Sequence, residues 1–124
     1  MSEVKPTTRD IDWLAGFLEG EGCFSIHNKR SAPSPSISFK STDYDVARKV
    51  ANMLDTPLHG PELRPRAKPI WQCHCVGTRA AEWMMTLWIL MGKRRRERIK
   101  EILTVWRQRP TSKLSVKKNR NRFI

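Results

Sequence analysis

The sequence predicts an α+β domain with the order helix, two strands, helix, two strands and two helices. Two observations carry this prediction: the spacing of apolar residues switches between helical and strand periods, and Gly- or Pro-containing segments separate the periodic stretches. In three of the four predicted strands, apolar side chains alternate with polar ones. We therefore expect one antiparallel four-stranded sheet with helices on one face and a polar opposite face.

The first helix is predicted to end near residue 21, within the segment LAGFLEGEG at positions 14–22. At 100° per residue, its large apolar side chains face the core of the domain, whereas Trp13, Gly16 and Gly20 fall on the opposite side. Glycine costs about 1 kcal/mol relative to alanine inside a helix, so two glycines four residues apart need a reason. Close packing against a second helix provides one. We therefore expect this side to form a dimer interface.

Three further segments alternate apolar and polar residues as strands do, and they lie at 22–27, 36–40 and 70–76. A fourth strand between residues 58 and 66 is expected to be short and irregular, because prolines interrupt it.

Helices are predicted to alternate with these strand pairs. The first is expected to be capped by Asp10 or Asp12, and the second to begin at Thr42, with Asp45 completing a capping-box-like pair. The last two helices are predicted over 79–91 and 93–108. The domain is thus expected to span residues 1–108, and the basic tail, residues 109–124, to be flexible.

The chain is strongly basic, with 24 Lys and Arg residues against 12 Asp and Glu residues and a net charge of +12. This excess indicates an anionic polymer as partner, most simply nucleic acid; a basic protein of a membrane surface is the weaker alternative. No apolar run approaches the ~20 residues of a membrane span, and no secretory signal is visible. Three cysteines in such a chain are typical of an intracellular protein without disulfides.

Residues 14–22 resemble the LAGLIDADG motif of homing endonucleases in its single-motif form. Two later segments are similar to the same family: residues 39–46 resemble its strand-to-helix junction, and residues 93–96 resemble the basic turn before its last helix. The resemblance covers roughly residues 10–107. It implies a homodimer whose motif helices pack side by side at a two-fold axis, and a metal-dependent, site-specific double-strand cut in DNA.

The resemblance also implies an active site. The final acid of the motif is Glu21, which with the backbone carbonyl of Gly20 is expected to bind a divalent metal, Mg²⁺ or Mn²⁺. Asp43 corresponds to the polar residue that helps to position the attacking water, and Lys93 to a basic residue near the site. Two plainer interpretations stay open: Asp43 as a first-turn helix residue, and Lys93 as a solvated charge.

The polar face of the sheet is the predicted DNA-binding surface. A β-ribbon fits the major groove, which is about 12 Å wide, and neighbouring Lys and Arg side chains would bind phosphates. The predicted DNA-binding residues lie on this face and on its loops: Ser25, His27, Lys29, Arg30, Ser36, Ser38, Lys40, Arg64, Arg66, Lys68, Gln72 and His74. A solvated strand face is the alternative.

Cysteine and histidine residues at positions 73–75 invite a zinc hypothesis. Adjacent strand residues point to opposite faces, however, and no Cys-x-x-Cys pair is present. We therefore expect Cys73 and Cys75 to pack in the core.

Two function classes follow from the sequence. The first is an intron-encoded homing endonuclease that acts as a homodimer on double-stranded DNA. The second is a non-cleaving nucleic-acid-binding protein of the same fold, either a maturase that binds intron RNA or a DNA-binding regulator. Intact Glu21 and Lys93 favour the endonuclease.

Overall fold

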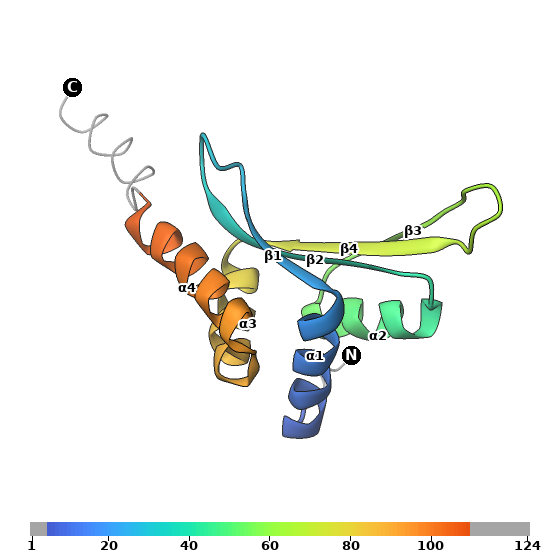
Figure 1. The fold of residues 1–124 in the computed structure, drawn as a ribbon, viewed down its shortest axis with the longest axis horizontal. Coiled ribbons are helices and arrows are strands. Elements are labelled where there is room, and N and C mark those ends of the chain that lie inside the picture. Colours follow the sequence, from blue (N-terminus) through green and yellow to red (C-terminus); the bar gives the residue numbers. More distant parts are fainter. Residues whose placement is uncertain (1–4, 110–124) are drawn as a thin grey trace.

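The computed structural model describes residues 5–109, and these residues have the predicted element order (Figure 1). The helices lie below the sheet in Figure 1 and leave its upper face uncovered. The elements are α1 (Thr8–Glu21), β1 (Gly22–His27), β2 (Ser34–Ser41), α2 (Tyr44–Leu54), β3 (Leu58–Glu62), β4 (Ile70–Val76), α3 (Thr78–Leu87), the 3₁₀ helix η1 (Trp88–Leu90) and α4 (Lys93–Gln108).

The four strands form one antiparallel sheet in the order β1-β2-β4-β3. In the central pair, Phe39 of β2 lies opposite Cys73 of β4, and Ser38 lies opposite His74. The register between β3 and β4 shifts between His59 and Glu62, in the segment predicted to be irregular. The sheet is therefore two hairpins joined along β2 and β4, with their turns at opposite ends of the sheet (Figure 1).

The core lies between the helices and one face of the sheet. Leu14 and Leu18 of α1 are fully buried, and Ile37 and Phe39 of β2 belong to the same cluster. The helices reach this cluster with one side each, as their apolar spacing predicts.

Cys73 and Cys75 are buried in this cluster, as predicted. Burial raises the pKa of the Cys73 thiol to about 12 and also raises the pKa of Cys75. Both side chains are therefore neutral thiols at neutral pH, which suits packing and opposes metal ligation.

The predicted cap of the first helix is wrong. Thr7 is the N-cap: its hydroxyl accepts a hydrogen bond from the Asp10 backbone N–H over 3.1 Å, and the Asp10 carboxylate accepts one from the Thr7 N–H over 2.9 Å. These two bonds make a capping box with Asp at its third position, and they hold the pKa of Asp10 below its ordinary value. Asp12 lies inside the helix.

The predicted starts and ends of two other helices also change. α2 begins at Tyr44 with Asp43 as its N-cap, and the expected pair of Thr42 and Asp45 is not its cap. The Asp43 N–H donates to the Ser41 hydroxyl over 3.0 Å, so a short turn precedes the helix. α3 ends at Leu87 and is followed by η1, so the helix expected over 79–91 is shorter.

Among residues 5–109, no helix has both the length and the apolar composition that crossing a bilayer requires. The predicted flexible tail, apart from Arg109, lies outside the described residues.

Candidate active site and nucleic-acid interface

The last two turns of α1 have one buried side and one open side. Leu14 and Leu18 are fully buried, whereas Gly16 and Gly20 are exposed, and a Cβ atom added at either glycine would meet no atom within 4 Å. Glu21, the last residue of the helix, is also exposed. The helix thus ends in an exposed carboxylate next to a surface with room for close packing.

A groove of about 770 Å³ runs along the open side of α1. One wall contains Gly16 and Glu21, and the other contains the junction between β2 and α2, so that Lys40 shares the groove with the Glu21 carboxylate. The residues that line it are Asp12, Trp13, Gly16, Phe17, Glu21, Lys40, Ser41, Thr42, Val46 and Ile70.

Trp13, a predicted interface residue, is half-buried in this groove. Its ring stacks on Phe17 with 5.8 Å between centroids, and Phe17 in turn meets the Phe39 ring edge-on at 5.3 Å. The Lys49 ammonium lies 3.9 Å from the centroid of the Trp13 ring. These contacts hold the indole against the subunit's own core, so on the α1 wall of the groove Gly16 is the position that leaves room for a close neighbour.

Glu19 and Glu21 differ in their surroundings although they are two residues apart. Glu19 Oε1 accepts a hydrogen bond of 2.7 Å from the Gly92 backbone N–H, and Glu19 Oε2 lies 3.8 Å from Arg95 Nε. Glu19 is therefore engaged with the start of α4. Glu21 remains available to the groove.

The other two predicted catalytic residues lie at helix starts. Lys93 is exposed and is the first residue of α4, directly after the Gly92 that binds Glu19. Asp43 is exposed at the N-cap of α2, and its side chain makes no capping hydrogen bond. Asp43 does not line the groove, whereas the preceding residues Ser41 and Thr42 do.

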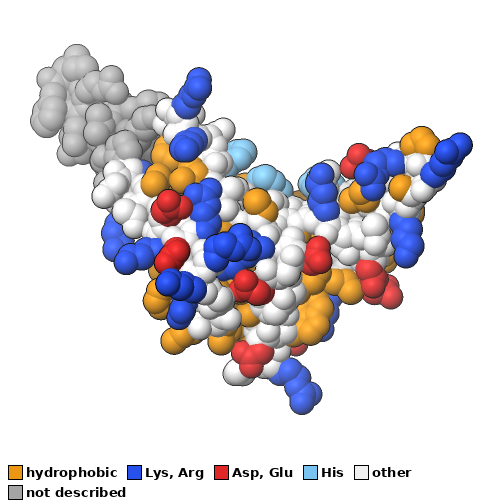
Figure 2. Space-filling model, in the orientation of Figure 1, with side chains coloured by type: hydrophobic (Ala, Val, Ile, Leu, Met, Phe, Trp, Pro, Cys, Tyr) orange, Lys and Arg blue, Asp and Glu red, His pale blue; other side chains and the backbone are white. Residues whose placement is uncertain are grey.

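Most predicted DNA-binding residues of the strands share the uncovered face of the sheet. The register places Ser25 beside Ser36, Ser38 beside His74, and Lys40 beside Gln72. His27 and His74 are exposed, and their ring centroids lie 5.6 Å apart. Figure 2 shows histidine side chains along the hollow of this face.

Ser36 lies on this face but is only 1% exposed. Its hydroxyl lies 3.1 Å from Nε2 of His74. Ser36 therefore supports His74, which faces solvent. The sequence led us to expect a direct contact between Ser36 and DNA, but such a contact would require the side chains that cover Ser36 to move.

The remaining predicted DNA-binding residues occupy the two hairpin turns. Lys29 and Arg30 follow β1, and Arg64, Arg66 and Lys68 lie between β3 and β4; all five are exposed. Figure 2 shows Lys and Arg side chains at both raised ends of the molecule, on either side of the hollow. The positive charge thus lies at the two ends of the polar sheet face.

Sequence reasoning missed three contributors to these surfaces. His59 pairs with Gln72 and, with His74, lines a second groove of about 400 Å³ on the sheet face. The prolines around His59 hid its strand register. Ser41 and Thr42 were overlooked beside Glu21, although their position directly after a predicted strand was visible in the sequence.

Comparisons with known proteins agree with this geometry. Residues 14–68 match the sequence model of a family described as LAGLIDADG endonuclease. No curated protein matches the chain in sequence.

Several solved structures share the fold. The homing endonuclease I-CvuI in complex with its target in the presence of calcium superposes with a TM-score of 0.62 and 19% identity, over 83% of this chain and 69% of that one. I-CvuI bound to the I-CreI target in the presence of magnesium, with the DNA not cleaved, superposes with a TM-score of 0.58 and 18% identity. The match covers 82% of this chain and 68% of that one. The group I intron-encoded homing endonuclease I-CeuI bound to DNA superposes with a TM-score of 0.58 and 14% identity. The match covers 86% of this chain and 59% of that one.

At these identities the solved structures establish the fold, and the sequence match adds the motif. The matched region begins at the Leu14 of the motif helix and runs into the second hairpin. The chain therefore has the fold of the LAGLIDADG homing endonucleases and carries the sequence signature of that family at residues 14–68.

Proposed function

We propose that this chain is a homodimeric homing endonuclease that cleaves both strands of a specific DNA site with the help of a divalent metal. One observation carries the proposal: the exposed Glu21 carboxylate stands at the end of a helix whose Gly16 and Gly20 leave room for a second helix. A two-fold axis through this open side would bring the Glu21 residues of two copies together. Each sheet face would then bind one half of the DNA site.

The donor set fits a hard divalent cation. Within residues 5–109, no three His, Cys, Asp or Glu side chains gather into a metal site. One copy would therefore supply the Glu21 carboxylate and the Gly20 carbonyl, and leave positions for water and phosphate oxygens. Mg²⁺ and Mn²⁺ accept this arrangement, because they prefer oxygen ligands, and Mg²⁺ usually binds through one or two carboxylates plus phosphate. When bound, such a cation activates water and stabilises charge on the phosphate.

Neighbouring residues of the chain would complete the site. Lys40 in the groove and Lys93 at the start of α4 would place positive charge near the reacting phosphate, where charge develops during cleavage. Asp43 would help to orient the attacking water from the start of α2, as the family resemblance implies. Its exposed carboxylate, free of a capping bond, leaves it available for that role.

The uncovered sheet face supports binding to duplex DNA. Exposed His27, Gln72 and His74 offer donors and acceptors to base edges, and the basic hairpin turns offer phosphate contacts on either side. The net charge of +12 makes such binding strongly dependent on salt, because each neutralised phosphate releases counterions.

A cleavage assay on a library of duplexes with randomised sequence tests the proposal. With Mg²⁺ or Mn²⁺ we expect cuts in both strands at one enriched site, and none with EDTA. Binding of a specific duplex without any cut, under both metals, would refute the endonuclease and favour a non-cleaving DNA-binding regulator. Tighter binding to structured RNA than to any duplex would favour the intron RNA maturase.

A further inference from the structure

The C-terminal end of α1 and the N-terminal end of α4 carry charges that oppose their helix dipoles. α1 ends with Glu19 and Glu21, and its last turn contains no basic residue. α4 begins with Lys93 and three arginines, and its first turn contains no acidic residue. Acids at a helix C-terminus and bases at a helix N-terminus are each unfavourable. Neither helix end is stabilised by its own sequence.

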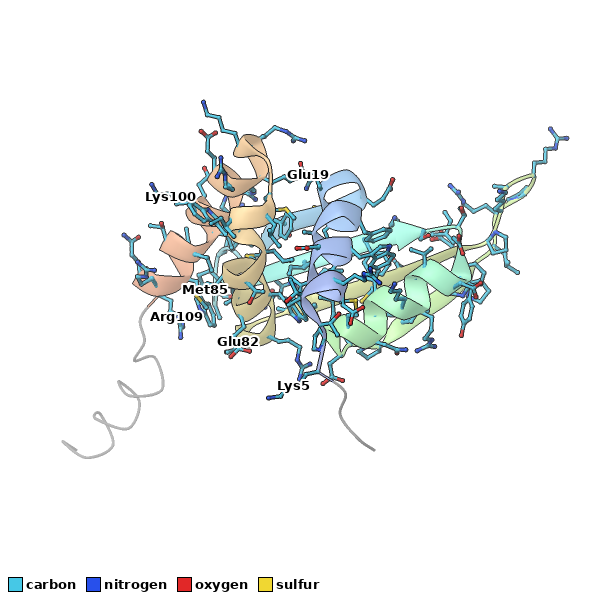
Figure 3. The ribbon with its side chains drawn as sticks, turned by 90° about the horizontal axis from the view of Figure 1, so that it is seen from below. Lys5, Glu19, Glu82, Met85, Lys100 and Arg109 are labelled. Atoms are coloured by element: carbon cyan, nitrogen blue, oxygen red, sulfur yellow. The ribbon has the colours of Figure 1, made fainter. Side chains whose placement is uncertain are left out.

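The two ends supply each other's missing charge. Glu19 of α1 places its carboxylate at the start of α4, where Oε1 accepts the Gly92 N–H over 2.7 Å. Arg95 of α4 places its guanidinium at the end of α1, where it donates to the Glu19 carbonyl over 3.0 Å and to the Gly22 carbonyl over 2.7 Å. Figure 3 shows Glu19 on the side of α1 that faces α3 and α4.

The guanidinium shape of Arg95 is needed for this arrangement. The side chain is only 15% exposed, and its two terminal nitrogens bind carbonyls on either side of Gly20 and Glu21. Its Nε is buried 3.8 Å from Glu19 Oε2 and, within the described residues, has no closer partner. A lysine would keep the charge but could not span both carbonyls, because its ammonium is a single point donor.

We propose that Arg95 and Glu19 are the positioning residues of the cleavage site, an inference that rests on the proposed function. Arg95 fixes the last turn of α1, which carries Glu21 and the Gly20 carbonyl. Glu19 fixes the start of α4, which carries Lys93 one residue after Gly92. The pair thereby holds the metal-binding acid and the basic residue as one rigid unit, although neither Arg95 nor Glu19 lines the groove that contains Glu21.

The test measures metal response separately from DNA affinity. Arg95→Lys should raise the half-saturating Mg²⁺ concentration for cleavage about 10-fold, as loss of residues that orient ligands commonly does. Its affinity for the DNA site without metal should change by no more than about twofold, because the charge is kept. Arg107→Lys, an exposed change at the other end of α4, is the matched control and should leave both values unchanged.

Two further readouts do not depend on cleavage. Calorimetric titration of the protein–DNA complex with Ca²⁺ should show the same weakening in Arg95→Lys. Hydrogen exchange at the Gly92 amide should accelerate in Glu19→Ala but stay slow in Glu19→Gln, whose amide oxygen still accepts that bond. If Arg95→Lys unfolds, Glu19→Gln replaces it in the metal titrations, since it removes the charge facing Arg95 and keeps the acceptor; a smaller increase in the Mg²⁺ requirement is then expected.

The outcomes separate the two proposals. A wild-type protein that neither cuts DNA nor binds metal refutes the proposed function, and the positioning role with it. A wild-type protein that does both, while Arg95→Lys matches it in Mg²⁺ and Ca²⁺ response, overturns only the positioning role. A variant that loses thermal stability with an unchanged metal response would leave Arg95 as a structural helix cap and refute the inference.

Discussion

The hydroxyl of Ser36 lies 3.1 Å from Nε2 of His74, with the serine buried and the histidine exposed. This contact crosses the central strand pair of the sheet and fixes an imidazole at the middle of the uncovered face. His27 packs edge-on against the same ring from β1. The buried Ser36 therefore sets the orientation of the exposed His74, although Ser36 itself is not accessible to a ligand.

Ser36→Ala should weaken binding to the specific DNA site about fivefold, the effect of a typical lost hydrogen bond of about 1 kcal/mol. The loss should concentrate at the base pair that His74 contacts, so that substituting this pair costs the variant less than it costs the wild type. Fluorescence anisotropy with a series of substituted duplexes measures both effects. In a His74→Ala background, Ser36→Ala should change nothing; a full loss there would place Ser36 in some other role.

Gly20→Leu tests the homodimer. The Cβ of a residue at this position meets nothing within 4 Å in the subunit, so the variant should fold normally. At a close helix pair the same side chain would collide with the partner, and the dimer dissociation constant should rise about 100-fold. Light scattering over a dilution series reports the mass. Thr86→Leu, which adds a leucine on the exposed side of α3, is the control; if both variants stay dimeric, the interface lies elsewhere.

Glu21→Gln tests the catalytic acid. The change keeps the size of the side chain but removes the charge that would hold the metal, so cleavage should fall at least about 100-fold. DNA binding should persist or tighten, since a carboxylate beside the phosphates is removed. Gel-based cleavage and anisotropy measure the two properties. Glu82→Gln on α3, remote from Glu19 in Figure 3, should retain full activity; joint loss of binding and cleavage in Glu21→Gln would instead assign Glu21 to folding.

Cys23 lies on the sheet face that we propose binds DNA. It is exposed on β1 opposite Ser38, whereas burial raises the pKa of Cys73 and Cys75 and leaves them unreactive thiols. Maleimide should therefore label Cys23 alone in the folded protein, as mass spectrometry of peptides would show. Specific DNA should slow this labelling, and high salt should restore it by releasing the DNA. Equal rates with and without bound DNA would exclude this sheet face as the interface.

The element order was predictable because it depends on local periodicity, and burial of one side per helix or strand is what holds the domain together. The α1 cap was not found because Thr7, Asp10 and Asp12 are all acceptable capping residues, and only the reciprocal hydrogen bonds of Thr7 with Asp10 select among them.

The candidate site was predictable only in part, for a different reason. Glu21 and Lys93 follow from motifs along the chain, but the contact of Glu19 with Gly92 joins positions 73 residues apart. No period or spacing encodes such a pair. Likewise, strand alternation placed Ser36 on the polar face correctly, but it cannot tell how far neighbouring side chains cover a small residue.

The sheet order β1-β2-β4-β3 has a consequence for how such a protein could acquire a new target. Each hairpin turn projects beyond an opposite end of the β2–β4 seam, and the seam is held by the pairs from Ser36 with Val76 to Ser41 with Trp71. Exchanging residues 28–33 should therefore leave the register of the second turn intact, and exchanging 63–69 should leave that of the first. Energetic effects at such separated sites usually add. Recognition of the outer and inner parts of a DNA half-site could then be changed by altering one hairpin turn at a time. Favourable changes in the two turns could be combined without redesigning the core.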